Sequence, residues 1–203
     1  MKSIDPNQLA ERENYKFLTG SIIPRPVAFV TTLSNEDVLN AAPFSYFNIV
    51  SSNPPMISIS VARKDGKMKD TSRNAVERKE FVVHISDESY IEQINKTAKS
   101  LPPNESEITE TNLTPVHSLK IKVPGIQEAK VRMECVLEQA IPLGGTKDQP
   151  ACDLLIGRVV QYHIRSDLYE NGRIDAQGLK PVSRLAGNAY AKLGETFELE
   201  RPI

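Results

Sequence analysis

Alternation of apolar and polar residues is the dominant pattern along this chain, and it predicts a protein built mainly from β-strands. The two longest alternating runs cover 131–141 and 154–164, with Gly144 and Gly145 between them and Gly157 inside the second. The glycine pair predicts a turn, and Gly157 predicts a bulge or bend within its strand. Two long strands joined in this way favour a meander that curls into a barrel.

Shorter runs predict further strands at 27–33, 38–42, 56–61 and 81–85, the first two forming a hairpin. Helical spacing predicts short helices at 9–18, from an Asp70-Thr71-Ser72 cap through Arg78, and after Ser86-Asp87, where Ile91, Ile94 and Ala98 share a face. Residues 101–118 lack a clear periodicity, so we predict a surface loop or a lid there. We predict a short closing segment at 179–193. The expected fold is one domain, residues 1–203, mainly β with short helices.

The composition and net charge exclude some classes of binding partner. The 203 residues suffice to bury a core, and 25 basic against 26 acidic residues give a net charge of -1. Such a balance excludes a global field that recruits nucleic acid or an anionic membrane, so any anion site must be local. Cys135 and Cys152 lie in apolar alternating runs and predict buried thiols in a reducing compartment. Because the N-terminus has no apolar h-region, we expect a cytoplasmic protein.

A face of small hydroxyl groups lies on the predicted strand 56–61. Ile57, Ile59 and Val61 share one face, whereas Ser58 and Ser60 lie on the other with Met56. This pattern is typical of a half-exposed edge strand, and also of a strand that a ligand approaches closely. Both interpretations stay open.

A basic loop precedes the helix predicted at 70–78. Arg63, Lys64, Lys67 and Lys69 lead into Asp70 and Thr71, where free helix amides would add partial positive charge. The arrangement predicts a phosphate site, with a solvated basic loop as the alternative.

Ser45-Tyr46-Phe47-Asn48 places amide and hydroxyl groups among aromatic rings. These rings are either core anchors or part of a pocket for a flat ring system. A flat heteroaromatic molecule that carries a phosphate would use both this segment and the basic loop.

Other kinds of site receive no support from the sequence. His84, His117 and His163 do not have metal-ligand spacing, and the chain contains no CxxC, Walker, G-x-S-x-G or Rossmann motif. We therefore predict no metal, and we assign no acid–base catalytic residue. His163 is either a satisfied histidine within a sheet or a polar neighbour of a ligand.

The stretch from Gly20 to Ile85 resembles the flavin reductase-like proteins with an FMN-binding split β-barrel of Greek-key type, a group that includes flavoredoxin. The resemblance rests on the segments 25–30, 40–48 and 63–71, and more loosely on 124–135, 157–164 and 184–190. The family often has two glycines where this chain has Ala186 and Gly187.

The resemblance implies a homodimer with one FMN per subunit in a groove that both chains border. By position, the isoalloxazine would be lined by Ser45, Tyr46, Phe47 and Asn48, with Ser58 and Ser60 facing it. Lys69 and Thr71 would hold the phosphate, and Arg63, Lys64 and Asp70 belong to the same loop. His163 and Tyr190 would lie near the ring or the partner chain.

Three functional hypotheses follow from this resemblance. In the first, NADH or NADPH reduces bound FMN, which passes electrons to free flavin or another acceptor. In the second, the protein is an FMN-bearing electron carrier that receives electrons from a redox protein partner. In the third, it binds or stores flavin. No motif selects between NADH and NADPH or identifies the acceptor.

Overall fold

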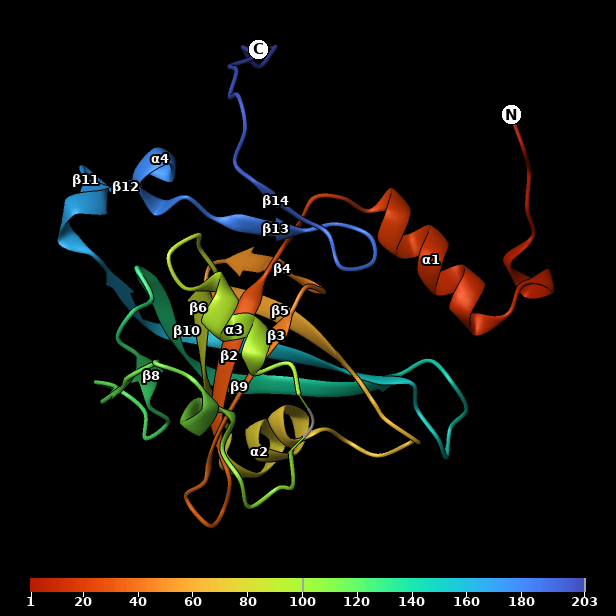
Figure 1. The fold of residues 1–203 in the computed structure, drawn as a ribbon, viewed down its shortest axis with the longest axis horizontal. Helices are drawn as coiled ribbons and strands as arrows, with labels where there is room; N and C mark the ends of the chain where they lie inside the picture. The colour runs from red at the N-terminus through yellow and green to blue at the C-terminus, as the bar shows by residue number, and fades with distance from the viewer. Residues whose placement is uncertain (100, 203) are drawn as a thin grey trace.

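The computed structural model describes residues 1–99 and 101–202, and its largest element is a seven-stranded antiparallel sheet (Figure 1). The strands lie in the order β3-β2-β6-β9-β10-β5-β4. All the strands predicted from alternation are confirmed to within two residues at each end, whereas β4 was not predicted. The bounds are β2 Ala28–Leu33, β3 Leu39–Phe44, β4 Phe47–Ser52, β5 Pro55–Ala62, β6 Glu80–Ile85, β9 Val131–Leu143 and β10 Cys152–Ile164.

The two edges of this sheet meet at one corner. β3 and β4 lie at opposite ends of the strand order, yet only Ser45 and Tyr46 separate them in the chain. So short a connection requires the sheet to curl until its edge strands are neighbours. At the corner, the Ser60 amide donates a 2.8 Å hydrogen bond to the Tyr46 carbonyl. The predicted β-barrel is thereby confirmed.

Close packing inside the barrel explains the glycine in β10. The ring of Phe81 on β6 is fully buried against Gly157, and a Cβ at Gly157 would overlap that ring. The register of β10 on β9 shifts beside Ile156, so the bulge predicted at Gly157 is confirmed. The core around this contact contains Ala28, Val30, Ile57, Ile59, Val61, Ala75, Val83, Met133, Cys135, Leu137, Leu155 and Val159.

The helices are short and lie outside the barrel. α1 (Glu11–Ser21) confirms the helix predicted at 9–18, and α2 (Asp70–Arg78) confirms the helix expected up to Arg78. In Figure 1, α1 and the C-terminal hairpin lie at one end of the barrel, and α2 lies at the other. The described residues contain no helix with the length and apolar character needed to cross a bilayer.

Two helix starts were misplaced: α2 begins one residue earlier than predicted, and α3 begins later than predicted. The N-cap of α2 is Lys69, so Asp70 is the first helical residue and not the cap. α3 (Ile91–Lys96) begins after Tyr90, and Ala98 lies beyond its end. The Asp87 carboxylate instead accepts hydrogen bonds from the amide and hydroxyl of Ser89, forming a local turn that competes with a helix cap.

Residues 101–118 do not form a detached lid. The 3-10 turn η2 (Glu107–Glu110) buries Glu107 and Ile108, and Leu113 is buried in the same cluster. The Glu107 carboxylate accepts a 3.0 Å hydrogen bond from the Ala41 amide, on the edge strand β3. The segment therefore covers an exposed sheet edge, which explains why it lacks a simple periodicity.

The predicted closing segment at 179–193 is a hairpin. β13 (Val182–Arg184) pairs with β14 (Tyr190–Lys192) and with β1 (Arg25–Pro26), which forms a small three-stranded sheet. The other elements are β7 (Pro115–Val116), β8 (Gly125–Ile126), β11 (Tyr169–Glu170), β12 (Arg173–Ile174), α4 (Ala176–Leu179), η1 (Pro6–Gln8) and η3 (Ser166–Leu168).

The two cysteines differ in environment. Cys135 is buried, as predicted, and burial raises the pKa of its thiol. Cys152 begins β10 and is only half-buried, so the prediction of two buried thiols is wrong for this residue. Both are free thiols.

Candidate functional site

The aromatic segment and the serine-bearing strand lie side by side. β4 pairs with β5 so that Phe47 lies opposite Ile59 and Asn48 lies opposite Ser58. The Tyr46–Ser60 backbone hydrogen bond extends this pairing into the barrel corner. The structure therefore brings together the segment 45–48 and both serines, although they are separated in the chain.

The serines lie on the outer face of the barrel wall. Ser58 and Ser60 are half-buried, and their partners on β10 are Ile156 and Leu154. Partners directly across an antiparallel pair share a face, so two small hydroxyl side chains lie beside two half-buried apolar ones. This surface has the mixed polar and apolar character of a site for a flat ring.

The start of α2 offers unpaired hydrogen-bond donors. No side chain caps this helix, and amides in a first helical turn have no partner within the helix. The Ser72 hydroxyl is buried and has no partner among the described residues. Asp70 adds negative charge here, but it pairs with Arg73 at 2.5 Å. These groups fit an anion at the helix start.

The basic loop carries less free charge than its sequence indicates. The Arg63 guanidinium pairs with Asp153 at 2.6 Å, and that carboxylate is only 2% exposed. Arg63 therefore fastens β5 to β10, and it is not a free cation. Lys64, Lys67 and Lys69 are exposed, and none of them has an ion-pair partner in the described part of the chain.

A tight turn fixes the path of this loop. Lys64 and Lys67 exchange backbone hydrogen bonds of 2.9 and 3.0 Å. Between them, Asp65 and Gly66 both have positive φ angles, of 51° and 72°. Two central residues with positive φ are typical of a type I′ hairpin turn, which the Asp-Gly pair favours. The predicted turn is confirmed.

A buried polar network joins the helix start to the sheet. The Asn40 side-chain amide donates to the Thr71 hydroxyl at 3.0 Å and to the Thr32 hydroxyl at 3.1 Å. Asn74 donates to Thr32 at 3.3 Å. Thr71 is buried and keeps its own hydroxyl proton for donation. No local pattern around Asn40 indicated this role.

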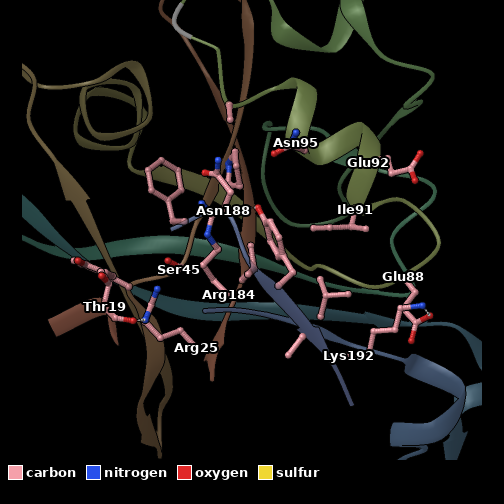
Figure 2. A pocket seen from close by; sticks show the side chains of 18 of the residues that line it. Thr19, Arg25, Ser45, Glu88, Ile91, Glu92, Asn95, Arg184, Asn188 and Lys192 are labelled. Atoms are coloured by element: carbon pink, nitrogen blue, oxygen red, sulfur yellow. Dashed lines mark hydrogen bonds and ion pairs between the residues drawn. The ribbon is translucent and has the colours of Figure 1, made fainter. Parts of the chain in front are cut away.

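A large cavity lies at the other end of the barrel. Its volume is about 1080 Å³, and its walls come from α1, the β1-β13-β14 sheet, the corner 43–46 and the segment 88–98. Of the predicted site residues, only Ser45, Tyr46 and Tyr190 line it. The barrel corner therefore borders both this cavity and the serine-bearing strand, and Figure 2 shows Ser45 beside Arg184 in the cavity.

Two arginines in this cavity were not predicted as site residues. Arg25 and Arg184 lie directly opposite each other on β1 and β13, and both line the cavity. Figure 2 shows them on the same side of the cavity, close to Ser45. The prolines on either side of Arg25 were a usable indication, because they fix a charged residue in an otherwise apolar stretch.

His163 is not brought to the serine face within this chain. It lies seven residues along β10 from Ile156, the partner of Ser58, and its Nε2 lies 2.6 Å from the Glu134 carboxylate. Burial by itself would raise the pKa of Glu134. The amides of Leu119 and Lys120 and the His163 ring outweigh this effect and hold that pKa below its usual value. The geometry is that of a satisfied sheet histidine.

The described residues contain no group of three or more His, Cys, Asp or Glu side chains arranged to hold a metal ion. The site thus consists of a phosphate-compatible helix start, a serine-bearing wall, an aromatic corner and a deep cavity.

Comparisons with known proteins agree with this description. The model of the flavin reductase like domain matches residues 19–179. The chain is similar to the crystal structure of nitrilotriacetate monooxygenase component B from Bacillus cereus, with 69% identity, a TM-score of 0.97 and 98% of each chain covered. It is also similar to Pseudomonas fluorescens 2-nitrobenzoate 2-nitroreductase NbaA, with 30% identity, a TM-score of 0.88, and 99% of this chain and 96% of that chain covered.

Among curated proteins, YwrF of Bacillus subtilis is 58% identical over 198 residues, which cover 97% of both chains. The match to the domain model spans most of the chain, and the relatives are covered nearly end to end. This protein belongs to the flavin reductase-like family.

Proposed function

We propose that this protein is an FMN-binding oxidoreductase in which NADH or NADPH supplies electrons that free flavin or another acceptor receives by way of FMN. The observation that carries the proposal is the start of α2, where unpaired amides and the orphaned Ser72 hydroxyl lie beside exposed lysines. Lys69 and Thr71 would hold the phosphate of FMN there, with Lys64 adding long-range attraction.

The ring would lie against the serine-bearing wall. β5 leads from the aromatic corner at Ser60 to the basic loop at Arg63, so one strand connects the two ends of the proposed site. Ser45, Tyr46, Phe47, Asn48 and Ser58 provide polar groups and aromatic surface around it. When bound, FMN supplies the hydride and electron chemistry, and the protein's own residues bind and orient it and admit the reactant.

The names of similar proteins support a redox role. Nitrilotriacetate monooxygenase component B is by its name one part of a multi-component oxygenase, and NbaA is a nitroreductase. They support an acceptor that is either flavin delivered to a second protein or a small organic molecule. The whole flavin site, including the roles of His163 and Tyr190, remains part of this proposal.

We also propose that two copies associate as a homodimer. Large apolar side chains are exposed on α1 (Leu18, 56%), at its C-cap (Ile22, 59%) and on β4 (Ile49, 78%). A second copy of the chain would remove these side chains from water, which is favourable. Light scattering coupled to gel filtration tests this proposal, with Ile49→Glu expected to shift the protein toward monomer. A parent protein with the mass of a single chain would reject this proposal.

Stopped-flow mixing distinguishes the three functional hypotheses. A reductase bleaches the flavin band when the FMN-loaded protein meets NADH or NADPH without oxygen. No bleaching with either donor, but reduction by a redox protein, would replace the reductase with an electron carrier. Flavin that neither nicotinamide donor nor a redox protein reduces would leave only binding or storage. A protein that stays colourless in an FMN titration would end the proposal.

A paired substitution tests the phosphate end. Lys69→Ala with Thr71→Ala removes one charge and one hydroxyl, and should weaken FMN binding about a hundredfold. Lys67→Ala is the matched control, because it removes an exposed lysine from the same loop but lies two residues before the helix N-cap. Equal FMN affinity in the double variant and the control would refute the placement of the phosphate.

A further inference from the structure

We infer that the cavity beside α1 is an anion site, in which Arg25 and Arg184 bind the carboxylate or phosphate group of a small organic molecule. The cavity of about 1080 Å³ is large enough for a molecule of drug size. Its walls include α1 and the β13-β14 hairpin, which lie at the end of the barrel opposite α2 (Figure 1), and no residue of the proposed FMN phosphate site lines it.

The two arginines form an uncompensated pair of positive charges. Arg25 on β1 and Arg184 on β13 are direct partners in an antiparallel pair, which places their Cβ atoms about 5 Å apart. Like charges in this arrangement destabilise a sheet. Neither guanidinium forms an ion pair within the described residues. An anion between them would relieve the repulsion.

Arg25 is held in place and still incompletely satisfied. It is only 7% exposed, and its Nη1 donates to the carbonyls of Thr19 at 2.8 Å and Ile22 at 2.5 Å. Its Nη2 donates to the Leu185 carbonyl at 3.0 Å. Its Nε is buried without a partner in the described part of the chain. The carbonyls fix the guanidinium but leave its charge unbalanced, and an unbalanced buried charge is costly.

Arg184 is the more accessible partner. Its Nη1 donates to the Tyr190 hydroxyl and its Nη2 to the Gly187 carbonyl, each at 2.5 Å. The guanidinium carbon lies 4.6 Å from the Tyr190 ring centroid, a cation–π arrangement that fixes the plane of the group. Its remaining N–H groups have no hydrogen-bond partner in residues 1–99 and 101–202, and the side chain lines the cavity. A planar fork held in this way suits an oxyanion.

The acidic residues of the cavity do not neutralise the arginines. Glu88 pairs with Lys192 at 2.8 Å, which lowers the pKa of the Glu88 carboxyl. Figure 2 shows Glu88, Lys192 and Glu92 on the far side of the cavity from Arg25 and Arg184. The cavity thus has a positive end, and that end is the one beside the barrel corner.

The remaining walls indicate an organic body for the ligand. Phe44, Ile91 and Val182 contribute apolar side chains to the cavity wall. A carboxylate or phosphate would therefore bind at the arginines, with its apolar or aromatic part against these side chains. The suggestion that this part reaches bound flavin past Ser45 and Tyr46 rests on the proposed function, whereas the anion binding does not.

Isothermal titration calorimetry at low salt tests the site, with benzoate and pyrophosphate as the anions and benzamide as the neutral analogue of benzoate. We expect benzoate or pyrophosphate to bind, and benzoate to bind at least about tenfold tighter than benzamide. Tighter binding of benzoate would indicate that the site takes a carboxylate-bearing substrate. Tighter binding of pyrophosphate would indicate that it takes a dinucleotide. Absence of binding by both anions, or equal affinity for benzoate and benzamide, would overturn the inference.

Substitutions at Arg184 assign the binding to this residue. Arg184→Gln should weaken anion binding about tenfold or more, and Arg184→Lys should weaken it less, because the charge remains but the planar fork is lost. Arg173→Gln, which removes an exposed arginine outside the cavity, controls for net charge. Equal affinity in Arg184→Gln and the parent would overturn the inference, as would an equal loss of affinity in Arg184→Gln and Arg173→Gln.

The same variants separate this inference from the proposed function. FMN affinity should be unchanged in Arg184→Gln, because the proposed phosphate site at α2 is intact. Anion binding that depends on Arg184 in a protein that ignores FMN would uphold the anion site and reject the flavoprotein. Loss of FMN affinity in Arg184→Gln would place the cofactor itself at the arginines and overturn the inference.

Discussion

Lowering the pH from 7 to 5 should weaken the fold through one buried histidine. His84 is fully buried on β6, and its Nδ1 donates a 2.9 Å hydrogen bond to the Phe29 carbonyl. Its Nε2 accepts a 2.9 Å hydrogen bond from the Ile126 amide. This pattern requires the neutral ring, because a protonated Nε2 cannot accept a hydrogen bond.

The size of the effect follows from the pKa of His84 in the two states. Burial lowers the pKa to about 3 in the folded protein, and the positive charge of Arg132 acts in the same direction. In the unfolded chain the pKa is about 6.5. Because the folded pKa is the lower one, the contribution is complete above pH 6.5 and is lost as the pH falls toward 3. At pH 5, about 1.5 units below 6.5, the loss is about 2 kcal/mol.

Urea unfolding at pH 7 and pH 5 measures this loss. With a urea dependence of about 2 kcal/mol per molar, the midpoint should fall by about 1 M through His84 alone. His84→Gln should be less stable at pH 7 and should lose about 2 kcal/mol less between the two pH values. Protein concentration and flavin content must be kept fixed, because ligands and subunit association also shift the midpoint.

A neighbouring core variant provides the control. Val83→Ala removes buried apolar volume from the same strand, and it leaves His84 in place. It should lower stability at both pH values while keeping the parental pH dependence. If His84→Gln and Val83→Ala show the same difference between pH 7 and pH 5, the assignment to His84 is wrong.

Three further predictions test the packing. Gly157→Ala should cost about 1–3 kcal/mol by overpacking against Phe81, and Phe81→Leu should recover part of it; an unchanged thermal midpoint would contradict the close contact. Arg63→Gln should lower the midpoint of urea unfolding, because it leaves the buried Asp153 carboxylate unpaired; an unchanged midpoint would contradict a stabilising role for this ion pair. In the native protein, a thiol reagent should modify Cys152 and leave Cys135 protected until unfolding, and modification of both at one rate would contradict the burial of Cys135.

The parts of the fold that the sequence predicts well are those with local periodicity. The strands of the barrel wall alternate apolar and polar residues, so they were located closely, and Gly157 was correctly assigned to a bulge. β4 was missed because both of its faces are largely exposed in this chain and its sequence does not alternate. The start of α2 was misplaced by one residue, because the cap preference of Asp70 is overridden by the geometry of the preceding loop.

Non-local contacts account for what could not be predicted at the site. Arg63 looked like a free cation, but its partner Asp153 lies ninety residues further along the chain, on β10. The paired arginines of the cavity lie on strands separated by most of the chain, and only the register of β1 on β13 brings them together. Residue type and local spacing contain no information about such pairings.

The two residues of the barrel corner, Ser45 and Tyr46, both close the barrel and border the candidate site. Ser45 and Tyr46 are the whole connection between the two edge strands, so their backbone is fixed by pairing on both sides. They also border both the arginine cavity and the serine-bearing wall. Because the sheet cannot open without moving them, the surface that they offer to a ligand is preorganised by the fold. The stability of the barrel and the geometry of the site therefore depend on the same backbone contacts.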